Sequence, residues 1–206
     1  MGRMETTPLR VYGGVAGGDR QAERRAQFVE AGLDLLGSGE ELTVRGVCRR
    51  AGLASRYFYE SFTDRDALAE AVFDQVVGDI VTRTLAAVAA APADATAKSR
   101  AGLATLVRII ADDPRTGRLL FSPAVNMPVL LRRRASSARM FARVLGSQAR
   151  AFYGEDGHAE LELDTEFLVG GLAQTLTSWL DDTLAWPEEA VVERCVTLFV
   201  AVGDLP

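Results

Sequence analysis

Apolar residues recur every three or four positions along most of this chain, and no convincing stretch alternates apolar and polar residues. The first helical face begins after Arg20 and consists of Ala22, Ala26, Val29, Leu33 and Leu36. Gly37 or Gly39 can then take the left-handed conformation that ends a helix. We therefore expect an all-α protein whose first helix starts near residue 20.

Two short helices and one long helix are expected next. Thr43 is the N-cap candidate of the first, which ends at Gly52, and the second runs from residue 55 to about 62. Thr63 is the N-cap candidate of the long helix, with Asp66 placed to complete a capping box. The long helix should extend from about residue 64 to about residue 90, because a proline follows at position 92.

Helical spacing continues to the end of the chain. The further expected helices cover about 94–112, 114–121, 127–153, 165–184 and 187–202, which makes about nine in all. We divide the chain into a flexible arm (1–19), a three-helix, homeodomain-like helix-turn-helix domain (20–66) and a larger helical domain (67–206).

Four aromatic residues crowd into six positions of the segment RYFYESFTDRDAL, which starts at residue 56. Phe58 and Phe62 are four residues apart, so they share a helical face and should pack into the core. Tyr57 and Ser61 point off that face. Tyr59 lies at its border, where the ring is partly buried and the hydroxyl can donate to a phosphate oxygen.

The stretch LTVRGVCRRAGLASRYFYESFTDRDALAEAVF resembles the DNA-binding segment of the TetR family of transcriptional regulators. That segment typically has a Thr-capped helix, Ala-Gly plus an aliphatic residue, a short recognition helix ending in Tyr-x-x-Phe, and then a basic residue and a leucine. The matching residues here are Thr43, Val47, Ala51, Gly52, Leu53, Tyr59, Phe62, Arg65 and Leu68. The resemblance covers roughly residues 20–72, and the remainder matches only in length and helical character.

The resemblance implies that this segment reads DNA in the major groove. The N-terminal part of a recognition helix lies deepest there, and arginine is the commonest reader of guanine. The residues expected to read bases are Arg45, Ser55, Arg56 and Tyr57. Those expected to hold phosphates are Thr43, Tyr59, Ser61, Thr63 and Arg65, with Arg24 or Arg25 as possible additions.

Three residues depart from the usual pattern of the family. Ala54 stands where Ser or Thr often caps the recognition helix, so Ser55 is an alternative cap whose hydroxyl would then be lost to base contact. Glu60 stands where an aromatic residue is common, and its carboxylate must turn away from the phosphates. Arg65 replaces the usual lysine and keeps its charge.

The last two long helices are apolar enough to be buried on more than one side. In the family, these helices pair across a two-fold axis, so the resemblance implies a homodimer; an internal core is the alternative. The expected interface residues are Leu168, Leu172, Leu176, Val192, Cys195 and Phe199. Two recognition helices would then read a palindromic operator.

The resemblance also implies a small-molecule pocket within the ligand-binding and dimerisation domain, 67–206. The candidate lining residues, each with an ordinary core position as the alternative, are Phe121, Met127, Phe141, Gln174 and Trp179. Few polar residues interrupt these helices, so an apolar or aromatic effector is expected. The consecutive arginines 132–134 are typical of a solvated face, with an anion site as the alternative.

The charge distribution fits DNA binding although the net charge is −5. Residues 1–66 have ten Arg and ten Asp or Glu, residues 67–154 have twelve basic and six acidic residues, and residues 155–206 have one Arg and twelve acidic residues. The acidic excess therefore lies in the last quarter of the chain, where it can be held away from phosphates.

Other classes of function have less support. His158 is the only histidine and has no recognisable nucleophile partner, and the two cysteines lack metal-ligand spacing, so neither an enzyme nor a bound cofactor or metal is expected. A protein-binding adaptor would leave Arg45, Arg56 and Arg65 without a role. No secretory or membrane segment is apparent, so a cytoplasmic location is expected. The expected function is a sequence-specific, DNA-binding transcriptional regulator, namely a homodimeric repressor that a small-molecule effector releases from its operator.

Overall fold

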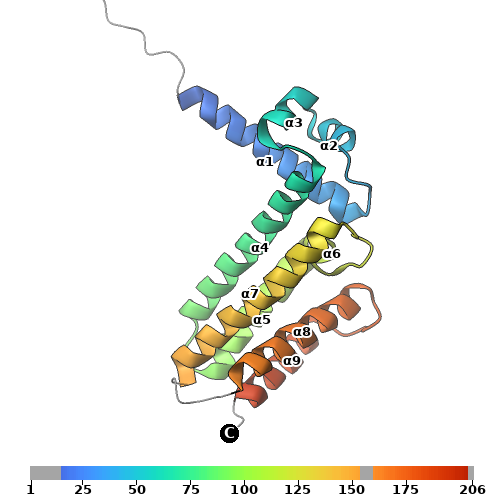
Figure 1. Cartoon of the computed structure of the whole chain (residues 1–206). Helices are drawn as coiled ribbons and strands as arrows, with labels where there is room; N and C mark the ends of the chain where they lie inside the picture. Colours follow the sequence, from blue (N-terminus) through green and yellow to red (C-terminus); the bar gives the residue numbers. More distant parts are fainter. Residues whose placement is uncertain (1–14, 154–159, 204–206) are drawn as a thin grey trace, which may run out of the picture.

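The computed structural model describes residues 15–153 and 160–203, and within these ranges it contains nine α-helices and no β-strand (Figure 1). They are α1 (Val15–Ser38), α2 (Val44–Ala51), α3 (Ser55–Ser61), α4 (Arg65–Ala90), α5 (Ala95–Asp112), α6 (Pro114–Phe121), α7 (Pro128–Tyr153), α8 (Leu161–Leu180) and α9 (Glu188–Gly203). α1 to α3 lie at one end of the molecule, and α4, α5, α7, α8 and α9 extend away from it (Figure 1). The predicted all-α class is confirmed. None of the described helices is both long and apolar enough to cross a bilayer.

Two helices differ noticeably from the expected ranges. α1 begins at Val15 and so takes in part of the predicted arm, of which residues 1–14 lie outside the described residues. α8 lies four residues earlier than predicted. It ends at Leu180 because the backbone turns: Asp182 has a positive φ of 59°, and the N–H of Leu184 donates to the carbonyl of Ser178 at 2.8 Å.

The caps of α2 are those that the sequence predicts. Thr43 is its N-cap, and the Oγ1 of Thr43 accepts a hydrogen bond from the N–H of Gly46 at 3.0 Å. Gly52 ends α2 in the left-handed conformation, with φ 68°. After α1 the same conformation falls on Gly39, with φ 77°, which leaves Gly37 inside the helix.

The caps of α3 and α4 differ from the prediction. Ala54 is the N-cap of α3 without a side-chain hydrogen bond, so Ser55 is the first helical residue and its hydroxyl is not used as a cap. Asp64 rather than Thr63 caps α4, because the carboxylate of Asp64 accepts the N–H of Ala67 at 2.8 Å. The Thr63 side chain is left exposed before the helix.

One continuous apolar core joins α1–α3 to the longer helices. Phe58 of α3 is fully buried, and the ring of Phe28 of α1 meets it edge-on with the centroids 5.5 Å apart. The same cluster includes Leu68 and Phe73 of α4 and Leu130 of α7. Burying each such side chain contributes about 1.5–3 kcal/mol. The predicted boundary at residue 66 therefore does not interrupt the core.

A second apolar cluster joins α5, α8 and α9. Leu103 and Val107 of α5 are buried there against Leu176 of α8 and Cys195 of α9. Cys195 and Cys48 are both free cysteines, and burial raises the pKa of each thiol. Both therefore behave as small apolar residues with weakly reactive thiols.

Candidate nucleic-acid interface and ligand cavity

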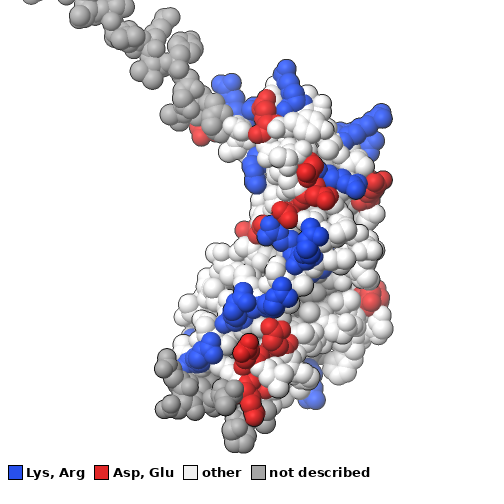
Figure 2. Space-filling view, in the orientation of Figure 1, with Lys and Arg blue, Asp and Glu red and all other residues white. Residues whose placement is uncertain are grey.

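α3 presents one apolar face to the core and one polar face to solvent. Phe58 and Phe62 are 0% and 6% exposed, whereas Tyr59 is 62% exposed. Ser55 and Arg56 are also exposed. Figure 2 shows several Arg side chains projecting from the end of the molecule that α1–α3 form. The amphipathic arrangement expected for α3 is therefore present.

The predicted base-reading residues are exposed with one exception. Arg45 and Arg56 project from α2 and α3, and no ion pair to a carboxylate is found for either among the described residues. Tyr57 is half-buried and packs against the core, and the guanidinium carbons of Arg24 and Arg56 each lie 4.5 Å from the centre of its ring. Its hydroxyl accepts a hydrogen bond from Arg56. Tyr57 is thus partly covered by cations of its own chain.

The predicted phosphate-holding residues lie around the same end of the molecule. Thr43 is half-buried at the N-terminus of α2, and Thr63 is exposed. Arg65 is exposed at the start of α4, but it is not free: its Nη1 donates to a carboxylate oxygen of Glu41 at 3.3 Å and to the carbonyl of Leu42 at 3.4 Å. Contact with a phosphate would have to compete with this exposed ion pair, which is weak.

Ser61 cannot serve as predicted in this conformation. Its Oγ is buried and has no hydrogen-bond partner among the described residues, so a phosphate oxygen cannot reach it. The angular offset from Phe58 predicts an outward Ser61, but it takes no account of how α1 and α3 pack against each other. Gln21 of α1 donates there to the carbonyl of Glu60 at 3.3 Å.

Arg49 is a cation outside the predicted set of DNA-contacting residues. It is exposed on α2, and it lies four residues after Arg45, so both share one helical face. That spacing could have identified it. The Glu60 carboxylate pairs with Arg24 of α1 at 3.5 Å, so Arg24, one of the two arginines expected to add a phosphate contact, has an acid beside it.

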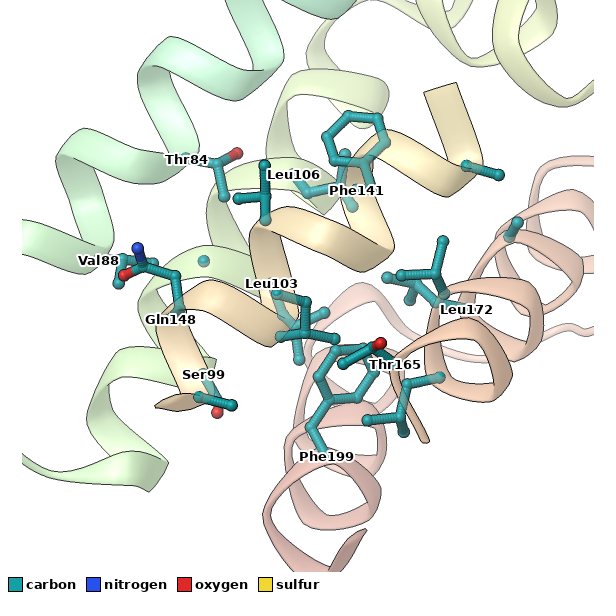
Figure 3. Close-up of a pocket in the computed structure, with 18 of the residues that line it drawn as sticks. Thr84, Val88, Ser99, Leu103, Leu106, Phe141, Gln148, Thr165, Leu172 and Phe199 are labelled. Atoms are coloured by element: carbon teal, nitrogen blue, oxygen red, sulfur yellow. The ribbon is translucent and has the colours of Figure 1, made fainter. Parts of the chain in front are cut away.

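A largely apolar cavity of about 620 Å³ lies between the longer helices, within the size range of small-molecule sites. α4, α5, α7, α8 and α9 all contribute to its wall. Figure 3 shows Leu103, Leu106, Phe141, Leu172 and Phe199 around it, with Ser99 and Gln148 among its few polar residues.

Two of the five predicted pocket residues line this cavity, namely Phe121 and Phe141. Met127 instead packs against the core that joins α1–α3 to α4, and Trp179 packs against the core of α5, α8 and α9. Gln174 is exposed on α8 and bonds to the Ser178 hydroxyl at 3.2 Å. The prediction weighed residue type, whereas the direction of each side chain decides which residues reach the cavity.

The residues predicted for a dimer interface point into the protomer. Leu176, Val192 and Cys195 are buried, and the other three line the cavity: Leu168, Leu172 and Phe199. The repeated spacing of leucines identified a face of α8 correctly as apolar but could not indicate which way it points. The large apolar residues that α8 and α9 expose are Leu163, Phe167 and Leu198, at 70%, 73% and 48% exposure.

α6 connects the cavity wall to α1. Arg115 of α6 donates to Glu30 of α1 at 2.7 Å and to Asp34 of α1, and it also pairs with Asp113 at 2.7 Å. Hydrogen bonds from Arg115 hold the pKa of the Asp113 carboxyl below its usual range, and these acids raise the pKa of Arg115. Asp34 also pairs with Arg50 of α2 at 3.5 Å, so α6, α1 and α2 share one ionic cluster.

No protein-family model and no curated protein sequence matches this chain. Solved structures do match it. A transcriptional regulator from Pseudomonas aeruginosa PAO1 aligns over 93% of this chain and 96% of its own, with a TM-score of 0.74 and 18% identity. A TetR-family regulator from Streptomyces coelicolor aligns over 88% of this chain and 80% of its own, with a TM-score of 0.68 and 20% identity. The regulator FadR from Bacillus subtilis, in complex with stearoyl-CoA, aligns over 86% of this chain and 98% of its own, with a TM-score of 0.67 and 15% identity. The chain therefore has the all-helical fold of the TetR-family transcriptional regulators.

Proposed function

We propose that this protein is a TetR-family regulator that binds a palindromic operator in double-stranded DNA as a homodimer, represses transcription there, and is released by a small-molecule effector. The observation that supports DNA binding most directly is the exposure of Arg45, Arg56 and Tyr59 at one end of the molecule, on top of a buried Phe58–Phe62 face. An adaptor or an enzyme would not require this arrangement.

Each part of the exposed end has a role in the proposed complex. Arg45, Ser55 and Arg56 approach base edges in the major groove, and Tyr59 and the N-terminus of α2 at Thr43 bind phosphates. Arg65 exchanges the Glu41 carboxylate for a phosphate when DNA binds. α8 and α9, which carry most of the acidic residues of the C-terminal quarter, lie apart from α2 and α3 (Figure 1), although Asp181 at the end of α8 lies close to the end of α1.

Dimerisation through α8 and α9 would cover apolar surface that the single protomer exposes. Leu163, Phe167 and Leu198 supply this surface. A Cβ on either Gly170 or Gly171 would meet nothing within 4 Å, so the backbone of α8 is open to close approach by a second helix. A two-fold axis here would place two recognition helices on half-sites about 34–36 Å, or a multiple of it, apart.

Release by an effector requires two conformations that differ in DNA affinity. The cavity is the proposed effector site, and a ligand there contacts α4, which begins beside the recognition helix. Ligand binding favours a state in which α4 swings and the separation of the two recognition helices changes. FadR of Bacillus subtilis, whose fold is similar, was solved with stearoyl-CoA, which supports a hydrophobic ligand here. The protein acts in the cytoplasm and needs no cofactor.

Selection of bound sites from random duplexes tests the proposal. The expected result is a palindrome with half-sites one helical turn, or a multiple of it, apart, and retention that falls steeply with salt. The double variant Tyr59→Phe/Arg65→Ala should lose retention on duplex DNA. Arg83→Ala should keep it, because Arg83 is an exposed arginine on α4 that is remote from α3. No enriched sequence, together with retention that is insensitive to salt and to both variants, would refute DNA binding.

A further inference from the structure

Arg134 is a cation in largely apolar surroundings. Its two neighbours in the arginine row behave as surface residues: Arg132 is exposed, and Arg133 pairs with Glu70 and Asp74 of α4, at 3.2 Å each. Arg134 instead turns inward and lines the cavity, and no carboxylate pairs with it among the described residues.

Within the part of the chain that the structure describes, the hydrogen bonds of the Arg134 guanidinium all go to one neutral acceptor. Its Nε and Nη2 donate to the carbonyl of Leu119 in α6, at 3.1 Å and 2.7 Å. A guanidinium has five N–H donors, so several remain for another acceptor. Burial lowers the pKa of Arg134, because it removes water from the charged guanidinium. Partly burying an unpaired cation costs desolvation free energy, and pairing it with an anionic ligand would offset that cost.

The rest of the cavity suits a long apolar body. Its wall follows α7 from Arg134 to Phe152 and α4 from Phe73 to Val88. At the rise of an α-helix these stretches are each on the order of 20–27 Å long. Apolar side chains from α4 to α9 line the cavity, including Leu106, Phe141 and Leu172. Protein interiors rarely leave apolar spaces of this size empty.

We propose that the cavity binds an amphipathic anion: a carboxylic acid with a long apolar chain, whose carboxylate pairs with Arg134 and whose chain lies along α7. Ser137 is one turn further along α7 and also lines the cavity, so its hydroxyl can donate to the same carboxylate. The inference deepens the proposed function, because it names the class of effector for the cavity.

A second cation offers a competing orientation. Lys98, the only lysine of the chain, lines the cavity near the N-terminus of α5, and its Nζ donates to the carbonyl of Val88 at 3.1 Å. α5 and α7 run in opposite directions, so Lys98 is near the end of the cavity remote from Arg134 (Figure 1). It provides a matched control, since it has the same charge in the same cavity.

Equilibrium dialysis of the full chain against palmitate, hexadecanol and palmitoyl-CoA tests the proposal, each at concentrations below micelle formation. Hexadecanol has the same chain without the charge, and palmitoyl-CoA has an anionic head group but no free carboxylate. The variants are Arg134→Gln, which keeps a donor for the Leu119 carbonyl, Arg134→Lys, which keeps the charge, and Lys98→Gln.

The wild type should bind palmitate at least about tenfold more tightly than hexadecanol, as expected for a charge-assisted hydrogen bond. Arg134→Gln should remove that difference while hexadecanol binding stays unchanged, which also shows that the variant folds. Arg134→Lys should retain part of the difference, and Lys98→Gln should leave it intact. Equal binding of palmitate and hexadecanol by the wild type would overturn the inference.

Two further outcomes would also overturn it: a palmitate preference that depends on Lys98, or tighter binding of palmitoyl-CoA that is insensitive to Arg134→Gln. None of these measurements requires DNA. Failure of the duplex selection would therefore refute the proposed function alone, and failure of the dialysis would refute the ligand class alone.

Discussion

Gly37 of α1 packs directly against Arg115 of α6. A Cβ built on Gly37 would lie 2.4 Å from the Cβ of Arg115 and 2.7 Å from its Cα, so the two backbones touch where any other residue would clash. Arg118, one turn further along α6, donates to the carbonyl of Gly37 at 3.1 Å. α6 is thus fixed to the end of α1 by both shape and hydrogen bonding, beside the Leu119 carbonyl that Arg134 binds.

Gly37→Ala should therefore destabilise the protein by about 1–3 kcal/mol, because the close backbone contact leaves no room for a methyl group. Gly78→Ala on α4 is the control, since a Cβ there meets nothing within 4 Å and alanine is the better helix former. Urea unfolding of both variants measures the difference. Equal stability of the two would show that α1 and α6 separate freely.

Acid should destabilise the protein partly through Asp113. Its pKa is lowered in the folded state by Arg115, so its contribution is present above the unfolded pKa of an aspartate and is lost as pH falls through the folded pKa. Asp113→Asn removes this titration and can keep the cap of α6. The free energy of unfolding should then fall less steeply than in the wild type between about pH 4 and about pH 2. An unchanged slope would contradict the pairing.

Variants of the DNA-facing end should separate specificity from affinity. Arg45→Ala or Arg56→Ala should cost about 1–3 kcal/mol on the selected operator and relax the preference at one base position. Tyr59→Phe should weaken operator and random duplex alike, because a phosphate contact carries no sequence information. Titration of each variant against both duplexes at one fixed salt concentration gives the comparison. If both arginine variants lose affinity equally for the operator and for the random duplex, Arg45 and Arg56 contact phosphates rather than bases.

Ser61→Ala should leave DNA affinity unchanged and stability unchanged or slightly raised, by at most about 1 kcal/mol. The buried hydroxyl of Ser61 has no partner among residues 15–153 and 160–203, so its removal breaks no hydrogen bond there. Thr63→Ala is the comparison, because that hydroxyl is exposed near the same edge. A clear loss of affinity in Ser61→Ala would mean that α3 and α1 separate when DNA binds.

Phe167→Glu should shift the protein from dimer to monomer and weaken operator binding at least about tenfold, because a charge would enter an apolar interface. Leu131→Glu on α7 is the control, since Leu131 is also an exposed apolar residue, at 48% against 73% for Phe167. Sedimentation velocity over a range of concentrations measures both. If the protein remains a dimer with Phe167→Glu but becomes a monomer with Leu131→Glu, the interface lies on α7 instead of α8.

The sequence by itself determined the class of fold, the short helices around Gly52 and the inward placement of Phe58 and Phe62. Local signals carry this information: helical spacing, a threonine cap and a glycine that tolerates positive φ act within one or two turns. Phe58 and Phe62 are inward as predicted, because a helix with one strongly apolar face has only one way to bury it. Tyr59, expected at the border with its ring partly buried, is instead exposed, and Tyr57, expected off that face, is half-buried.

Only the tertiary structure decided which way the other faces point. The α8 leucines share a face in the sequence pattern, but whether that face meets a second copy or the cavity depends on where α5, α7 and α9 pack. The same holds for Arg132, Arg133 and Arg134, which are chemically identical. Their positions differ by about 100° per residue around α7, so one meets solvent, one meets acids of α4 and one enters the cavity.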